Sequence, residues 1–328
     1  MNTKFGLNAL LRAELRCFVH KAFQTVFPGT PYLHNWHINA IVFEMMEVHS
    51  GRTRRLLINQ PPRSLKSLTI SVAYVAWVLG HDPKKRIIVA SYSSDFAAEL
   101  HRQFRLLVDA RWYRDIFPKM RVMRDTGTEC ITSMGGGRYA TSVGGTLKGR
   151  GADLIIVDDP TKAEEASSEP ARRRVIDWYS VTLITRLNNK DTDPLIIVAQ
   201  RLHEDDLPGH VLRQGEWRHL DLPAIATEDE LIPLGRGRNH ERRRGEVLHP
   251  ERESRAALDR LKVELGSLTF SAQYQQQPIP FEGNLIRRSW FREYERLPAT
   301  SSNSVIVQSW DVAMMTGISN DYSVCTRG

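Results

Sequence analysis

A lysine and a serine follow each other, Lys66-Ser67, where a short apolar run gives way to a helical pattern. The connecting segment, 59–67, reads NQPPRSLKS. A strand-to-helix turn binds phosphate because backbone N–H groups and the helix N-terminus face the anion. A lysine there neutralises β- and γ-phosphate charge, and a serine hydroxyl is a ligand for Mg²⁺. The segment therefore indicates a phosphate-binding loop. Its candidate binding residues are Arg63, Ser64, Leu65, Lys66 and Ser67.

The loop departs from the standard motif at two positions. That motif has glycine six residues and one residue before the lysine. This chain has Gln60 and Leu65 there. On the pattern alone, an ordinary turn with a surface lysine is the alternative, so the choice depends on the rest of the chain.

Two aspartates, Asp158 and Asp159, follow a second apolar run, 154–157. A strand delivers them to the carboxyl edge of the sheet, where α/β sheets bind ligands. We expect Asp158 to hold Mg²⁺, directly or through water, and Asp159 to orient the attacking water. Glutamate is usual in the second role, so this carboxylate is one methylene shorter. A turn with a helix N-cap is the alternative, but Lys66 and Asp158 at two predicted strand ends favour a nucleotide site.

Two arginines are candidates for neutralising the charge on the leaving phosphate. Arg63 lies within the loop and acts either in its own subunit or in a neighbouring one. Arg201 follows a third apolar run, 195–199, within the polar segment AQRLHEDD. A solvated acidic loop is the alternative for that segment.

The elements that position these residues alternate between strand and helix after about fifty residues of helical pattern. Predicted strands cover 56–59, 86–91, 129–134, 138–143, 154–157 and 195–199, and predicted helices cover 67–79, 95–108 and 169–187. The glycines at 135–137 predict a hairpin. Continuous apolar strands separated by helices indicate an α/β fold, with a mostly parallel sheet and helices on both faces.

Composition restricts the classes of protein. The chain has 328 residues, 41% hydrophobic and 25% charged, as is typical of a globular protein of about two domains. Lys and Arg number 45 and Asp and Glu 38, so the net charge of +7 allows a polyanionic partner.

The longest apolar run, 68–79, is shorter than the roughly 20 residues that a bilayer requires, and we see no secretory signal. Cys17, Cys130 and Cys325 lie far apart, which predicts reduced cysteines in a cytosol.

In combination, these segments resemble the large terminase subunit of tailed bacteriophages, the motor and nuclease of DNA packaging. Residues 61–67 resemble that family's deviant Walker A loop, and 144–153 (GGTLKGRGAD) lead into a Walker B strand that ends at the aspartate pair. Residues 200–207 (QRLHEDDL) resemble the segment after its coupling motif, and 270–278 (FSAQYQQQP) resemble the stretch before its nuclease domain. The four matches occur in the family's order.

The resemblance implies an ATPase domain of the additional-strand P-loop type over residues 1–205, with a helical N-terminal part over 1–50. A lid or linker subdomain follows over 206–285, and 286–328 begin an RNase H-like nuclease domain. Trp36 falls where the family has an adenine-contacting segment. A tryptophan buried in the core is an equal alternative.

The segment 309–313 (SWDVA) resembles the first strand of the family's nuclease domain. The match implies that Asp311 is the first metal-binding carboxylate and that Asp321 is a following acidic position. A two-metal nuclease needs several converging carboxylates. The others would lie beyond Gly328, so we expect the nuclease part to be incomplete here.

The resemblance implies ATP hydrolysis coupled to movement of double-stranded DNA into a viral procapsid. ATP and Mg²⁺ are the implied cofactors. The implied partners are double-stranded DNA bound without sequence preference, a small terminase subunit, a portal protein and further copies of the chain in a ring, all in the cytoplasm of a bacterial host. Two alternatives remain: another P-loop translocase or helicase, and an inactive prophage remnant that only binds DNA or partners.

Overall fold

The structure is a computed structural model that describes residues 3–147, 149–279, 308–311 and 324–327. The chain divides into two units, Met1–Pro280 and Phe281–Gly328. In the second unit, the described residues form two antiparallel strands, β11 (Gln308–Asp311) and β12 (Val324–Arg327). The remaining described elements belong to the first unit.

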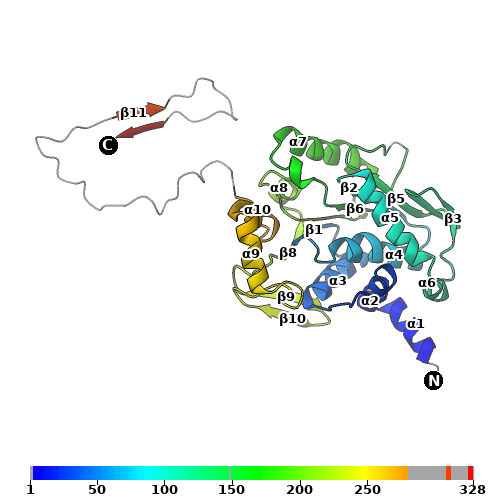
Figure 1. The fold of residues 1–328 in the computed structure, drawn as a ribbon. Coiled ribbons are helices and arrows are strands. Elements are labelled where there is room, and N and C mark those ends of the chain that lie inside the picture. The colour runs from blue at the N-terminus through cyan, green and yellow to red at the C-terminus, as the bar shows by residue number, and fades with distance from the viewer. Residues whose placement is uncertain (1–2, 148, 280–307, 312–323, 328) are drawn as a thin grey trace, which may run out of the picture. The chain divides into compact units, whose positions relative to one another are not determined.

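An eight-stranded sheet forms the centre of the first unit (Figure 1), in the order β3-β4-β5-β2-β6-β7-β1-β8. The strands are β1 (Arg55–Asn59), β2 (Arg86–Ser91), β3 (Val122–Asp125), β4 (Glu129–Thr132), β5 (Gly137–Ser142), β6 (Leu154–Asp158), β7 (Leu195–Ala199) and β8 (Arg218–Asp221). Those from β5 to β8 in this order run parallel, and β3 and β4 add an antiparallel edge. The predicted mostly parallel sheet and the β4–β5 hairpin are confirmed.

Strand β7 lies between β1 and β6 and pairs with both. It is the additional strand of the expected P-loop class, because it separates the strand before the lysine from the strand before the aspartates. In register, Asn59 faces Ala199, and Asp158 faces Val198. Three parallel strands therefore end side by side, and the segments that follow them share one edge of the sheet.

Helices cover both faces of the sheet, as predicted. One face carries α1 (Thr3–Ala13), α2 (Leu15–Val26), α3 (Trp36–His49), η1 (Leu68–Tyr74), α4 (Val75–His81), α5 (Ser94–Val108) and α6 (Arg111–Ile116). The other carries α7 (Glu169–Asp177), η3 (Trp178–Leu183), η4 (Ile184–Arg186) and α8 (Leu207–Arg213). Alternate side chains of each strand point to opposite faces, so Ile156 joins the first buried cluster and Val157 the second.

Two segments predicted to be α-helices contain π-helical turns. The predicted helix 67–79 begins as a π-helix, η1, before continuing as α4, and the predicted helix 169–187 changes into the π-helix η3 and the 3₁₀ turn η4. Every residue of η1 is buried. A segment without a polar face gives no sequence period, so the pattern could not distinguish the helix types. Single π turns are frequent at functional sites.

The sheet continues beyond residue 205, the expected end of the core. Strand β8 lies at its edge and has one buried side chain, Leu220, so no apolar run marks it in the sequence. After it, β9 (Glu230–Gly235) and β10 (Arg238–Arg242) form a hairpin that contacts α3, and α9 (Arg255–Leu265) packs with α10 (Ser267–Gln273). Within the described ranges, no helix is long and apolar enough to cross a membrane.

Candidate functional site

The candidate phosphate loop leaves β1 after Asn59 and becomes helical at Lys66. Arg63 and Leu65 have φ angles of 57° and 63°. This left-handed region costs a non-glycine residue about 1–2 kcal/mol, and Leu65 stands where the standard motif has glycine. The loop thus adopts a glycine-like backbone without glycine. Strain of this kind clusters at functional sites.

Two buried side chains hold the carbonyl of Ser64. Gln60 Nε2 donates a hydrogen bond to it at 3.1 Å, and His37 Nε2 lies 3.3 Å from it. His37 Nδ1 accepts from Asn35 Nδ2 at 2.7 Å, so Nε2 carries the proton and donates to Ser64. Burial lowers the pKa of His37 to about 3, which keeps the imidazole neutral. Gln60, at the other missing glycine, therefore stabilises the loop from inside.

Asp158 ends β6 and is fully buried. Its carboxylate accepts hydrogen bonds from the hydroxyls of Ser67 at 3.0 Å and Ser71 at 2.5 Å. Burial, together with the neighbouring charge of Asp159, raises the pKa of Asp158 to about 7 against the opposing effect of Lys66. A buried carboxylate held by neutral hydroxyls is poorly compensated, and a cation beside it would be stabilised.

Lys66 connects the loop to the second aspartate. Lys66 Nζ lies 2.9 Å from Asp159 Oδ2, and the lysine side chain is 7% exposed. Asp159 Oδ1 accepts a hydrogen bond from the Gln200 N–H at 3.1 Å, at the end of β7. The structure thus brings together the loop lysine and serine with both aspartates.

A cavity of about 520 Å³ adjoins the loop. Among the described residues that line it, the Lys and Arg side chains are Arg63, Lys66 and Arg252, and no Asp or Glu lines it. The apolar lining residues are Phe23, Phe27, Pro31, Leu33, Leu65, Leu68, Phe96 and Leu100. Cationic and apolar surfaces in one cavity suit a ligand with a polyanionic end and a hydrophobic ring.

Trp36 does not line this cavity. Its indole stacks on the imidazole of His240, with ring centroids 4.1 Å apart and planes at 17°, and the Arg242 guanidinium lies 5.5 Å from its ring centroid. Helix α3 therefore directs Trp36, which is half-buried, against β10. A contact with adenine stays a prediction. The next residue, His37, lines the cavity.

Arg201 follows β7, but its guanidinium is directed at Asp206. Arg201 Nε donates to both Asp206 oxygens at 3.0 Å, and Nη2 donates to the carbonyls of His203 and Glu204. Asp206 also accepts from three backbone N–H groups, those of Leu202, His203 and Gly209. Of the two candidate arginines, Arg63 lines the cavity and Arg201 does not.

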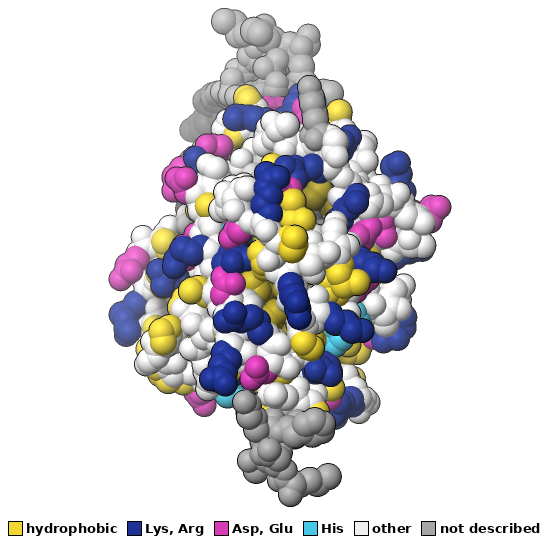
Figure 2. All heavy atoms as spheres, turned by 90° about the vertical axis from the view of Figure 1, so that its right-hand side faces the viewer, with side chains coloured by type: hydrophobic (Ala, Val, Ile, Leu, Met, Phe, Trp, Pro, Cys, Tyr) yellow, Lys and Arg dark blue, Asp and Glu magenta, His cyan; other side chains and the backbone are white. Residues whose placement is uncertain are grey.

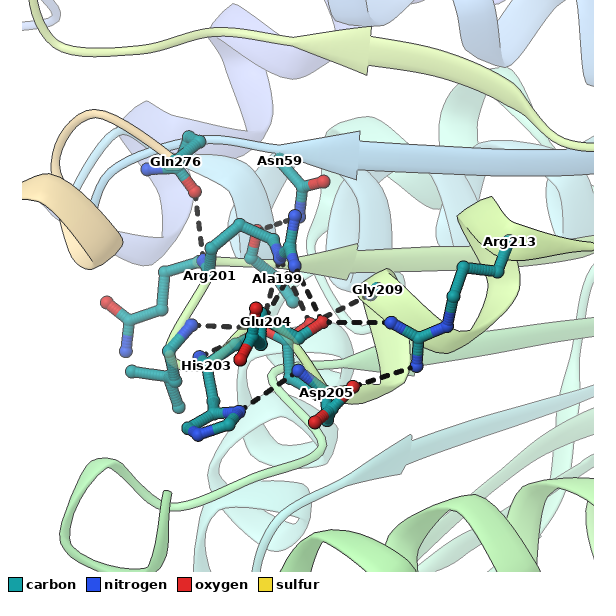
Figure 3. Close-up of polar contacts among 12 residues, drawn as sticks. Asn59, Ala199, Arg201, His203, Glu204, Asp205, Gly209, Arg213 and Gln276 are labelled. Carbon is teal, nitrogen blue, oxygen red and sulfur yellow. Dashed lines mark hydrogen bonds and ion pairs between the residues drawn. The ribbon is translucent and has the colours of Figure 1, made fainter. Parts of the chain in front are cut away.

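The loop after β7 is also joined to the last part of the first unit. Gln276 Oε1 accepts a hydrogen bond from the Arg201 N–H at 3.0 Å (Figure 3). The Gln275 amide accepts from the Ile225 N–H at 3.0 Å and donates to the Ile225 carbonyl at 2.8 Å. These glutamines thus fix the chain shortly before the second unit begins.

The candidate nuclease carboxylates belong to the second unit. Asp311 is the last residue of β11 and is paired in register with Val324 of β12. Asp321 lies outside the described residues. The assignment of metal-binding roles to these two residues stays a prediction.

Sequence reasoning did not find three residues that shape the loop. Ser71 follows Ser67 by four residues, a spacing that places both on one side of a helix and was a usable signal. The sequence pattern identifies Gln60 only as a departure from the glycine of the standard motif. His37 lies 27 residues before Ser64, and nothing local links them.

A solved structure of a phage terminase shares this architecture. The crystal structure of the HK97 bacteriophage large terminase matches 81% of this chain and 55% of its own, with a TM-score of 0.50 and 12% sequence identity. The chain has the fold of part of a bacteriophage large terminase. It spans about half the length of that protein, and at this identity the likeness concerns the fold.

Two further terminases match less closely. The large terminase ATPase domain of Thermus phage P74-26, as a mutant, matches 78% of this chain and 97% of its own, with a TM-score of 0.48 and 14% identity. The large terminase of another thermophilic bacteriophage, in complex with ADP, matches 71% of this chain and 52% of its own, with a TM-score of 0.39 and 12% identity. No protein-family model and no curated protein matches the chain in sequence.

Proposed function

We propose that this chain is the ATPase motor part of a phage DNA-packaging terminase. The observation that carries the proposal is the meeting of a loop lysine and serine with two strand-end aspartates. They lie at one edge of a sheet whose terminase-like fold is described above. The cavity beside them has cationic side chains and no acidic lining residue among the described ones.

The phosphates would be held by Lys66 and by the N–H groups of the loop and the first helical turn. In the structure, Lys66 is paired with Asp159. The γ-phosphate carries more charge than one carboxylate, so its arrival would draw Lys66 away. Asp159 would then be free to accept a hydrogen bond from the attacking water, while its other oxygen stays bound to the Gln200 N–H. Positioning and electrostatics supply the catalysis.

Mg²⁺ fits the donor set of Ser67 and Asp158. The cation prefers oxygen ligands, and these two residues present a hydroxyl and a poorly compensated carboxylate 3.0 Å apart. When bound, the ion would neutralise charge on the β- and γ-phosphates. Arg63 is the arginine that we propose to act on the transferred phosphate, in its own subunit or in the next one. Arg201, the other candidate, forms a buried pair with Asp206, and we propose that it positions the turn before α8.

The transported substrate would be double-stranded DNA, held through its phosphates. Lys and Arg side chains are spread over the face shown in Figure 2, with acidic side chains between them, and the net charge is +7. Binding of this kind weakens steeply with salt. The proposal includes a ring of copies, a portal protein and a small terminase subunit as partners in the bacterial cytoplasm. It also includes a lid or linker subdomain, in the part of 206–285 that follows β8, and a nuclease domain that begins near residue 286.

The test is Mg²⁺-dependent ATP hydrolysis by the 328-residue chain, with and without linear double-stranded DNA. Lys66→Ala and Asp158→Ala are measured beside the wild type. Activity that both changes abolish supports the site, and stimulation by DNA supports a motor. If the wild type neither hydrolyses nor binds ATP, the ATPase proposal is wrong.

A further inference from the structure

The cavity beside the loop has a second wall from much later in the chain. His249 and Arg252, in the segment after β10, line it together with residues 63–68. His249 is 9% exposed, and its Nε2 has no hydrogen-bond partner among the described residues. A buried polar atom in a cavity wall without a protein partner is the kind that a ligand or water satisfies.

This wall is tied to the phosphate loop. Asn35 Nδ2 contacts both His37 Nδ1 and the Leu248 carbonyl, so one amide fixes the ring that supports the loop and the residue before His249. The imidazoles of His37 and His249 lie 5.4 Å apart between centroids. The Arg252 N–H donates to the His249 carbonyl at 3.1 Å. The loop and this segment are therefore held in a fixed relation.

Arg63 and Arg252 both line the cavity. Neither side chain donates a hydrogen bond or forms an ion pair to another described residue. Lys66 adds a third cation to the same lining. Lys66 is paired with Asp159, whereas Arg63 and Arg252 have no carboxylate partner in the lining, so a bound polyanion would offset the charge of the two arginines.

We propose that His249 and Arg252 bind the polyphosphate of the nucleotide together with the phosphate loop, so that the ligand bridges the loop and the segment after β10. Arg252 supplies charge-assisted hydrogen bonds to phosphate oxygens. His249 supplies Nε2 as a neutral partner, since burial and the charge of Arg252 lower its pKa. The inference rests on the proposed ATP site and names two contacts that the Lys-Ser loop does not provide.

The experiment measures the binding of two probes, Mg²⁺-ATP and inorganic tripolyphosphate, to the 328-residue chain by calorimetry. Arg252→Gln should raise the Kd of both probes about tenfold, the size of one charge-assisted hydrogen bond. It should also reduce the salt dependence of binding, whereas Arg252→Lys should keep most of the affinity. His249→Phe retains a ring beside His37 and should raise both Kd values about threefold. The matched control is Arg255→Gln, which removes an exposed arginine paired with Asp259.

The outcomes separate the inference from the ATPase proposal. If ATP binding depends on Lys66 while Arg252→Gln and His249→Phe bind both probes like the wild type, the inference is wrong and the ATPase proposal stands. If tripolyphosphate binds through Arg252 but ATP does not bind, the ATP site is wrong and the polyphosphate contacts stand. If the wild type binds neither probe, both are overturned. Equal thermal unfolding of the Arg252 variants shows that any loss is local, because Arg252 is exposed.

Discussion

Two ion pairs lie at the same edge of the sheet and differ in how fully the carboxylate is satisfied. Asp206 accepts from Arg201 and from three backbone N–H groups. Asp159 accepts from Lys66 and from one backbone N–H. Its neighbour Asp158 is buried with a raised pKa. A carboxylate saturated by its own turn holds a loop in place, whereas an undersatisfied one can exchange its partner for a ligand.

The difference bears on how charged residues at strand ends are interpreted. The sequence presents Lys66 and Arg201 alike, each as a cation just after an apolar strand. In the structure, one cation lines a cavity and the other is enclosed by the turn that precedes α8. The number of donors around the partner carboxylate therefore separates a candidate ligand-binding charge from a structural one.

The largest effect is expected from Lys66→Ala. It should lower the rate of ATP hydrolysis by about two to three orders of magnitude, because it removes a preorganised charge from the transferred phosphate. A steady-state phosphate-release assay measures it. Lys162→Ala is the control, since that lysine is exposed and pairs weakly with Glu165 at 3.7 Å. If Lys66→Ala and Lys162→Ala hydrolysed ATP at the same rate, the proposed difference between the Lys66–Asp159 and Arg201–Asp206 pairs would be wrong.

Asp206→Asn should act on stability instead. Breaking the buried pair with Arg201 leaves a guanidinium without its counter-charge, at a cost of about 3 kcal/mol, which lowers Tm by roughly 6–12 °C. Thermal unfolding measures this. Asp205→Asn is the matched control next in the chain, and its exposed pair with Arg213 is worth under about 1 kcal/mol. A normal Tm with lost ATPase activity would instead make Arg201 a direct participant.

A third carboxylate at this edge, that of Asp221, is incompletely hydrogen-bonded. Burial raises its pKa to about 7, and its Oδ1 has no partner among the described residues. The folded state then keeps a proton that the unfolded chain releases near pH 4, so wild-type stability should fall as pH rises from about 4 to about 7, by at most about 1.4 kcal/mol per unit.

Urea unfolding between pH 4.5 and 7.5 tests this against Asp221→Asn, which should lack that contribution. Relative to the wild type, the variant should become steadily more stable up to about pH 7, and above that pH the difference in stability should stay constant. Burial lowers the pKa of His37 and His219 to about 3 and about 4, which makes both proteins lose stability as pH falls. That effect cancels in the comparison. Parallel curves would contradict the raised pKa of Asp221.

The smallest effect is expected from Leu65→Gly. Glycine relieves the left-handed strain of about 1–2 kcal/mol, but it loses apolar contacts and gains backbone freedom when unfolded, at about 0.5–1 kcal/mol for the second. We expect a Tm change below about 2 °C and an ATP Kd within about threefold. A large gain in stability would show that the strained loop is a substantial cost to this fold.

The sheet could be predicted because its central strands are continuous apolar runs, and the strand-end rule then placed Lys66 near Asp158. Three features could not be predicted, each for a physical reason. Strand β8 buries one side chain and carries no pattern. The orientations of Trp36 and Arg201 depend on residues that fold back from elsewhere, His240 and the turn to Asp206. The Leu65 conformation follows from bonds to Ser64 that a glycine count does not detect.

The glutamines at 275 and 276 have a mechanical consequence. Tension on the chain beyond residue 277 would load the hydrogen bonds between Gln277 and Ser271, and then the side-chain amide bonds to Arg201 and Ile225, before the ladder of the sheet. Such bonds each contribute about 1 kcal/mol net, so they would part before the parallel strands separate. Gln200 donates to Asp159, and its neighbour Arg201 donates to Gln276. A pulling force that arrives at Gln276 would therefore reach the backbone next to the Lys66–Asp159 pair.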